Sequence, residues 1–219
     1  MVLTFLIAVN ATAQNEHDFG VLVRGNIATQ TTKDPTKPED GTFQWDNLTT
    51  FGVGFFGSRE LKRNLHLCTR LTYLQKGFKE RADYGSIGGA PIFESATFQN
   101  SFHYISIDIL GKIYLSKKNV KPCVFAGLQG SILFSKNLES NIYPNNAFYP
   151  MSEYGDYKVN TNSWILGFGL DLNRTMSIEA EVNRDFTPVI KKDNLLVKNW
   201  LWSLSMQVSL HNILRDAGK

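Results

Sequence analysis

The sequence predicts an all-β protein, an eight-stranded antiparallel up-and-down transmembrane β-barrel with short periplasmic turns and long extracellular loops. Three observations predict it. Eight segments alternate apolar and polar residues one by one, which is the period of a β-strand. Short and long connections alternate between these segments, and charged residues stand within the polar faces. Lipid-facing and lumen-facing residues alternate in this way along the strands of outer-membrane barrels.

Composition agrees with one large β-domain. The chain has 219 residues, a formal charge of +3, 42% apolar and 12% aromatic residues. Lys and Arg are scattered rather than gathered in one segment, so we expect no nucleic-acid partner. No run of about 18 apolar residues occurs, which excludes a transmembrane helix. No motif indicates a cofactor, and we expect none.

The clearest strand is Ser101–Ser116. One face carries apolar residues and a glycine: Ile105, Ile107, Ile109, Gly111, Ile113 and Leu115. The other face carries Tyr104, Ser106, Asp108, Leu110 and Lys112. At about 3.3 Å per residue this strand is about 50 Å long, well beyond the usual strand of a soluble protein.

The first three of the other segments are Asp18–Gln30, Asn47–Gly57 and Leu65–Lys79. Their apolar faces carry, in order, Phe19, Val21, Val23 and Ile27; Phe51, Val53 and Phe55; and Leu65, Leu67, Leu71 and Tyr73. Arg24 and Asn26 oppose the first face, and Arg70 and Thr72 oppose the third. Each segment therefore predicts a strand with one face in lipid.

The last four segments are Lys121–Ser135, Thr161–Asn173, Met176–Phe186 and Lys198–His211. Their apolar faces carry, in order, Val124, Ala126, Leu128, Ile132 and Phe134; Trp164, Leu166, Phe168, Leu170 and Leu172; Ile178, Ala180 and Val182; and Trp200, Trp202, Leu204, Met206, Val208 and Leu210. Glu179 and Glu181 oppose the third of these faces. The sequence thus predicts eight strands.

The connections predict which end of the barrel is which. Those after the second, fourth and sixth strands are short: Ser58–Asn64, Ser116–Val120 and Arg174-Thr175. The others are long and polar, with Lys136–Asn160 the longest. Short turns are typical of the periplasmic end and long loops of the extracellular end. Aromatic residues near the long-loop ends predict an interfacial girdle: Tyr73, Trp164, Phe186, Trp200 and Trp202.

The first residues read as an export signal. An apolar run ends in Ala11-Thr12-Ala13, an A-x-A cleavage site. No basic residue precedes Arg24, so we expect the basic region of the signal to lie upstream of the printed start; a buried first strand is the alternative. The predicted organisation is a signal peptide over residues 1–13 and a barrel domain over residues 14–219.

The two cysteines predict neither a disulfide nor a metal site. Cys68 and Cys123 fall two strands apart, which places their Cα atoms about 10 Å from each other. A disulfide needs about 4.4–6.8 Å. No C-x-x-C spacing is present. We expect two inert thiols on the lumen face.

Two segments carry a resemblance to a known family. Leu71-Thr-Tyr-Leu-Gln-Lys-Gly77 resembles a strand ending in Tyr-x-x-Lys-Gly. Residues 104–112, followed by Lys121-Pro-Cys-Val-Phe-Ala-Gly127, are similar to a second signature of the same small outer-membrane β-barrel domains, the PorT-like type of Bacteroidota. Asp108 stands where that family usually has Pro, and Cys123 where it usually has an aromatic residue. The resemblance implies an eight-stranded outer-membrane barrel and no particular chemistry.

The inward faces carry charges of both signs. They are Arg24, Arg70, Asp108, Lys112, Asp171, Glu179 and Glu181. The lumen of an eight-stranded barrel is just wide enough for side chains to fill, and buried charges must be paired. Asp108 and Lys112 lie about 13 Å apart along one strand, so each needs a partner elsewhere. We expect a plug of ion pairs that closes the lumen; a narrow ion path is the alternative.

Three functions follow from such a barrel. The first is a structural or surface-binding role in the cell envelope, with an envelope protein or an extracellular ligand bound through loop 136–160. The aromatic residues of that loop are Tyr143, Phe148, Tyr149, Tyr154 and Tyr157, and Tyr among Asn and Ser is typical of recognition loops. We expect a monomer in outer-membrane lipid, associated with secretion or envelope machinery.

The second function is a lipid-modifying enzyme, and the third a soluble lipocalin-like barrel that binds an apolar ligand. An enzyme needs a His near Ser or a carboxylate at the outer rim. His103 lies near that rim with Ser101, but its parity points it to lipid, and His66 lies at the opposite end. No catalytic set can be assembled, so we expect no enzyme. The alternation of loop lengths and the lumen charges disfavour a lipocalin.

Overall fold

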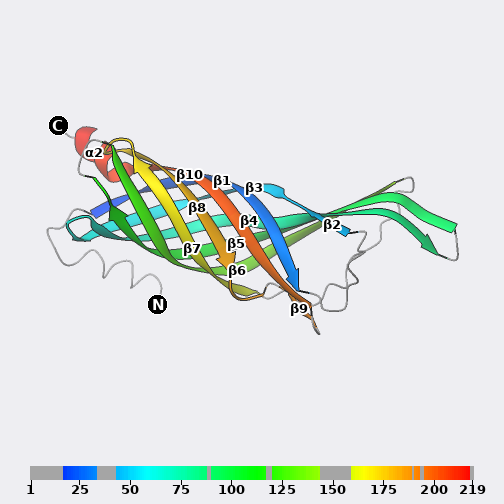
Figure 1. Ribbon diagram of the computed structural model, residues 1–219. Coiled ribbons are helices and arrows are strands. Elements are labelled where there is room, and N and C mark those ends of the chain that lie inside the picture. The colour runs from blue at the N-terminus through cyan, green and yellow to red at the C-terminus, as the bar shows by residue number, and fades with distance from the viewer. Residues whose placement is uncertain are drawn as a thin grey trace.

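Eight long strands form a closed antiparallel barrel in a computed structural model (Figure 1). The structure describes residues 17–33, 43–87, 90–116, 120–143, 159–188, 190–192 and 195–217. The barrel strands are β1 (His17–Lys33), β3 (Leu48–Lys62), β4 (Leu65–Ile87), β5 (Ala90–Tyr114), β6 (Lys121–Tyr143), β7 (Asn160–Asp171), β8 (Met176–Asp185) and β10 (Leu195–Ser209). The predicted fold class is confirmed.

Sequential strands are neighbours, and the first strand pairs with the last. The order is β1-β3-β4-β5-β6-β7-β8-β10, and β1 closes the barrel against β10 from Gly20↔Ser209 to Lys33↔Leu196. Two short strands stand outside this order: β2 (Phe43–Asp46) pairs with β4, and β9 (Ile190–Lys192) pairs with β10. Closure leaves no edge strand along the barrel wall, as the hydrocarbon of a membrane requires.

The barrel is apolar outside, whereas most of the side chains buried inside it are polar or charged. Large apolar side chains point outward all around it, such as Ile109, Leu128 and Phe168, at 55–62% exposure. Arg24 and Asp108 point inward and are at most 1% exposed. A lipocalin has the opposite arrangement, with apolar residues inside, so the soluble lipocalin-like alternative is wrong.

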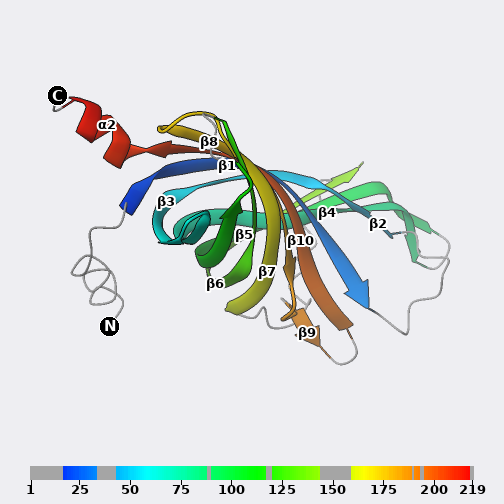
Figure 2. The same ribbon diagram turned by 60° about the vertical axis from the view of Figure 1, so that its left-hand side comes forward.

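The turns at one end are short. Arg63 and Asn64 alone join β3 to β4, and Asn64 adopts a left-handed conformation with φ 81°, which Asn tolerates better than most residues. The predicted connection Ser58–Asn64 was therefore too long. Between β7 and β8, the side chain of Asn173 accepts hydrogen bonds from the backbone N–H groups of Thr175 and Met176, at 2.7 and 2.8 Å. The start of β1 and the chain's last helix lie at this same end (Figures 1 and 2).

Strands at the other end run beyond the predicted boundaries. β4 and β5 stay paired as far as Ile87↔Ala90, and β6 follows β5 to Tyr143 (Figure 1). The predicted long loops after Lys79 and Ser135 are thus partly strand. The sequence of these segments lacks the alternation of apolar and polar residues that predicted the other strands, although their backbone pairs as a ladder.

The last described element is a helix, which begins where the alternation of apolar and polar residues predicted the end of the last strand. Leu210 and His211 were assigned to the last strand, but α2 (Leu210–Ala217) begins there. Ser209 caps it, because its Oγ accepts a hydrogen bond from the Asn212 backbone N–H at 3.1 Å. Within the described ranges, no helix has the length and apolar content needed to cross a membrane. The predicted signal peptide, residues 1–13, lies outside the described residues.

Both cysteines are buried and free. Cys68 lies on β4 and Cys123 on β6, with β5 between them. The two cysteines thus lie on strands that are not neighbours, as the sequence predicted.

Candidate functional site

Six of the seven predicted lumen charges meet in one cluster. Arg24 projects from β1, Arg70 from β4, Asp108 and Lys112 from β5, and Glu179 and Glu181 from β8. β4 and β8 lie on opposite walls of the barrel, so the cluster crosses the lumen. The inward faces carry the even-numbered residues of β1, β4 and β5 and the odd-numbered residues of β8. All six charged side chains therefore point into the lumen.

Glu181 binds both arginines. Arg24 Nη1 donates to Glu181 Oε1 at 2.9 Å, and Arg70 Nη1 donates to Glu181 Oε2 at 2.6 Å. Asp108 lies beside the same two cations, 3.5 Å from Arg24 Nη2 and 3.8 Å from Arg70 Nη1. The two carboxylates and two guanidinium groups therefore form a closed set of four charges that joins β1, β4, β5 and β8.

Glu179 extends this set toward the short-turn end. It accepts hydrogen bonds from Arg70 and Lys112, and a third from Gln207 Nε2 at 2.6 Å. Three cations and three carboxylates are thus balanced in the cluster. Burial of an unpaired charge would cost several kcal/mol, so this balance is what makes the charged lumen compatible with folding.

A second layer of polar residues lies nearer the long-loop end. Lys76 Nζ is 3.2 Å from Asp185 Oδ1, and Asp185 also accepts hydrogen bonds from Ser163 and from Asn199 Nδ2. Gln30 Nε2 donates to Asn199 Oδ1 at 2.9 Å. Lys76 and Asp185 were not among the predicted lumen charges, although Lys76 has the same inward parity as Arg70 on β4 and Asp185 the same as Glu181 on β8.

Two amides on the polar faces of β6 and β8, which were not among the predicted site residues, tie Asp108 into the wall of the barrel. Gln129 Nε2 donates to Asp108 Oδ1 at 2.8 Å, and Asn183 Nδ2 donates to Gln129 Oε1 at 2.7 Å. The alternation along the strands also places Gln129 and Asn183 on inward faces. Uncharged polar residues there can donate hydrogen bonds to a buried carboxylate. Together the ion pairs and amides connect side chains of β1, β4, β5, β6 and β8 across the middle of the lumen.

Asp171 lies apart from the ion pairs. It is half-buried at the short-turn end, where it hydrogen-bonds Tyr114 and lines a cavity of about 40 Å³. Arg70 and Lys112 line it on the lumen side, so the cavity ends at the charge cluster.

The candidate binding loop is largely outside the described residues. Phe148, Tyr149, Tyr154 and Tyr157 fall in residues 144–158, which the structure does not describe. Tyr143 ends β6. The predicted loop 136–160 was too long at its start, because residues 136–143 belong to the strand.

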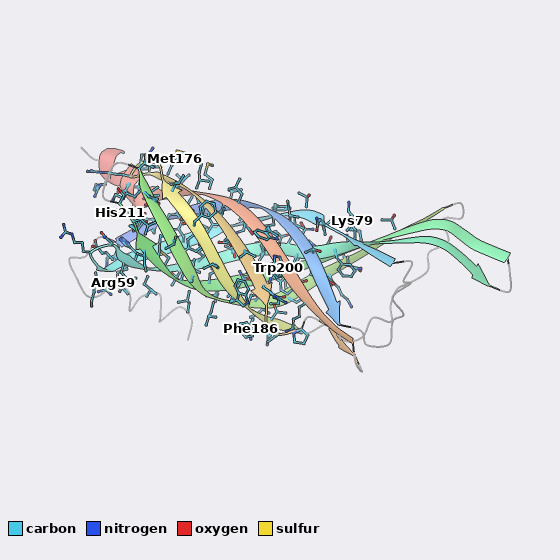
Figure 3. All side chains as sticks on the ribbon, viewed as in Figure 1. Arg59, Lys79, Met176, Phe186, Trp200 and His211 are labelled. Carbon is cyan, nitrogen blue, oxygen red and sulfur yellow. The ribbon has the colours of Figure 1, made fainter. Side chains whose placement is uncertain are left out.

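The aromatic residues predicted for a girdle form two groups on the outer wall. Trp164, Trp200 and Trp202 are neighbours, with ring centroids 6.4 Å apart for the first pair and 6.2 Å for the second. Tyr73 contacts Phe134 across β5, with ring centroids 6.1 Å apart. Figure 3 shows Trp200 and Phe186 well away from His211 and Met176, which mark the short-turn end.

The described histidines are spread over the molecule. His103 shares a 2.7 Å hydrogen bond with the Tyr73 hydroxyl on the outer wall, whereas His66 packs on Tyr114 at the short-turn end. His211 packs on Phe19 beside α2. Over the described ranges, no three His, Cys, Asp or Glu side chains are grouped so as to hold a metal ion.

Comparisons with known proteins give the family. Among solved structures, Pseudomonas aeruginosa OprG is 12% identical, with 90% of this chain and 97% of OprG covered and a TM-score of 0.49. Yersinia pestis Ail, solved in complex with the heparin analogue sucrose octasulfate, is also 12% identical, with 89% and 99% covered and a TM-score of 0.43. No curated protein matches. A family model described as "Outer membrane protein beta-barrel domain" matches residues 12–191, and the chain therefore belongs to this outer-membrane β-barrel family.

Proposed function

We propose that this outer-membrane barrel has a closed, non-conducting lumen and serves as a rigid base for binding at the cell surface. The observation that carries the proposal is the cross-lumen cluster. Arg24, Arg70 and Lys112 meet three carboxylates in the middle of the barrel, and all six side chains are buried. An ion that entered would have to displace these pairs, at a cost of several kcal/mol.

Planar-bilayer recording tests the closed lumen. The purified chain, inserted into a bilayer in 1 M KCl, is expected to give no steady single-channel openings, while a water-filled porin in the same bilayers does. Reproducible openings of one amplitude from the folded barrel would refute the closed lumen. The heat-modifiable gel shift of each preparation shows that the inserted protein was folded.

Surface binding is assigned to the segment after β6. The start of this segment follows the part of β6 that pairs with β5 as far as Ser95↔Tyr143, and its end leads into β7, which pairs with β6 from Ile132↔Asn160. A rigid base lowers the entropy lost when a loop binds. Tyr149, Tyr154 and Tyr157 supply the large, amphipathic side chains used in recognition. We propose an extracellular ligand or an envelope protein as the partner, bound by a monomeric barrel.

Matched deletions test this assignment. Removal of residues 145–157 is expected to abolish binding to cells or to a pulled-down partner and to leave the gel shift intact. Removal of residues 35–41, another loop-side segment, is the control and should leave binding unchanged. Equal binding by wild type and the first deletion would count against the assignment.

No catalytic role is proposed for the barrel. The Tyr73–His103 pair is the nearest approach to one, and the test is the mass of lipid A from cells that express the chain. An added or missing acyl group would overturn the non-enzymatic assignment. The link to secretion or envelope machinery rests on the PorT-like resemblance alone, and co-purification of a secretion component from the native membrane would support it.

A further inference from the structure

One row of outward side chains combines a cation with tryptophans. The register pairs Trp164 of β7 with Arg184 of β8, and Arg184 with Trp200 of β10. The guanidinium carbon of Arg184 lies 4.8 Å from the centroid of the Trp200 ring, which is a cation–π contact. We call Trp164, Arg184, Lys198, Trp200 and Trp202 the rim patch.

The rim patch is positively charged and unbalanced. Arg184 is exposed, and Lys198 stands two residues before Trp200, which puts it on the same outward face of β10. The described outward positions of β1, β7, β8 and β10 carry no carboxylate, because Glu179, Glu181 and Asp185 all point into the lumen. Within the described part of the chain, neither cation of the patch forms an ion pair.

A buried donor lies within the patch. The indole N–H of Trp200 is shielded from solvent and has no hydrogen-bond partner among the described residues. Buried donors of this kind are few in folded proteins, and each calls for an explanation. The guanidinium of Arg184 lies over this indole ring, so an anion that bound Arg184 would lie beside the same tryptophan.

The position of the rim patch in the barrel indicates which kind of anion it binds. Trp200 lies away from His211 and Met176 at the short-turn end (Figure 3), and the register places Arg184 and Trp164 beside it. In outer-membrane barrels the end opposite the short turns faces outside the cell. Below it the same strands continue as an apolar wall through Leu166, Val182 and Leu204. A ligand that joins a negative headgroup to acyl chains matches both parts of this surface, and basic residues at membrane interfaces bind anionic headgroups.

We propose that the rim patch binds the phosphate of an outer-leaflet glycolipid. Arg184 and Lys198 contact the phosphate, and Trp164, Trp200 and Trp202 pack on the sugar and the first acyl carbons. Arginine suits this task because its planar fork donates two parallel hydrogen bonds to phosphate. The proposal does not depend on whether the lumen conducts.

Titration in detergent tests the proposal. The purified chain in uncharged micelles is titrated with diphosphoryl lipid A, monophosphoryl lipid A, phosphatidylcholine and inorganic phosphate, and tryptophan fluorescence reports binding. R184Q and K198Q are each expected to weaken diphosphoryl lipid A binding about fivefold, and the double variant roughly 25-fold, since one cation near a membrane surface contributes about 1 kcal/mol. K121Q is the matched control, an exposed lysine at the opposite end of the barrel.

The outcomes separate the alternatives. Unchanged binding by the double variant, or an equal loss in K121Q, would overturn the proposal. Saturation by inorganic phosphate at the concentrations that suffice for the lipid would show an anion site rather than a lipid site, and would overturn it too. A wild-type dimer in detergent that the double variant converts to a monomer would show that a second copy occupies the patch. An unchanged heat-modifiable gel shift confirms that every variant folds.

Discussion

Glu179→Gln is the sharpest test of the lumen cluster. In the described chain, Glu179 is the only carboxylate within 4.0 Å of Lys112 Nζ, and it also accepts from Arg70 and Gln207. Gln has nearly the same volume and keeps one acceptor oxygen. The substitution therefore removes a charge and leaves the packing almost unchanged. Arg70 retains Glu181, but Lys112 remains buried without a counter-ion.

The expected loss follows from that unpaired lysine. Removal of one partner from a buried ion pair costs about 3–5 kcal/mol. Because Gln keeps one acceptor oxygen, we expect E179Q to lower the free energy of unfolding by about 3 kcal/mol, near the lower end of this range. Replacement of Lys112 by Met in the same chain removes the stranded cation as well. The double variant E179Q/K112M should therefore regain at least half of the loss, as coupled neighbours do.

Urea unfolding of the refolded barrel in lipid vesicles measures these losses, with the heat-modifiable gel shift counting the folded fraction. D46N, at an exposed carboxylate on β2, is the control and should change the free energy of unfolding by less than about 0.5 kcal/mol. The reasoning is refuted if E179Q loses no more than D46N. It is also refuted if the losses of E179Q and K112M simply add, since that would mean the two charges do not interact.

Three further outcomes are expected. Cys68 and Cys123 are buried, so a maleimide reagent should label neither in folded barrels and both in urea; rapid labelling before unfolding would contradict the burial. G127A should destabilise the barrel by about 3 kcal/mol in urea, because a Cβ there would lie 2.1 Å from a backbone oxygen of β5, whereas G25A meets nothing within 4 Å and should be neutral. S209A removes the cap of α2 and should cost the helix about 1 kcal/mol, seen as faster amide exchange in α2 but not in β10.

Much of the fold was readable from the sequence because a membrane barrel repeats one rule. Each strand alternates lipid-facing and lumen-facing residues, so eight alternating segments identified the eight barrel strands. The ends of the strands were harder to predict. β4 and β5 continue past Lys79 as a paired hairpin whose polar residues show no alternation, and the cap at Ser209 was overlooked because Leu210 continued the apolar parity of β10.

The sequence predicted the lumen cluster only as a set of residues that point inward. Parity placed Arg24, Asp108 and Glu181 on the lumen face, and the need to pair buried charges predicted cross-strand partners. Lys76 and Asp185 share this parity but were not among the predicted lumen charges. They meet across the lumen at 3.2 Å, 109 residues apart in the sequence. The role of a single inward charge can be assigned only when its partner across the lumen is known.

The sequence by itself thus determined the fold class, the inward and outward faces and the end with the short turns, because these follow from periodicity and turn length. Tertiary structure decided which charges meet. Arg24 and Glu181 are 157 residues apart, and their 2.9 Å contact depends on the register and on the closure of β1 against β10. It likewise decided that Arg184 lies between Trp164 and Trp200, since three strands must align before one row of side chains exists. Register and closure are properties of the whole barrel, and no single segment carries them.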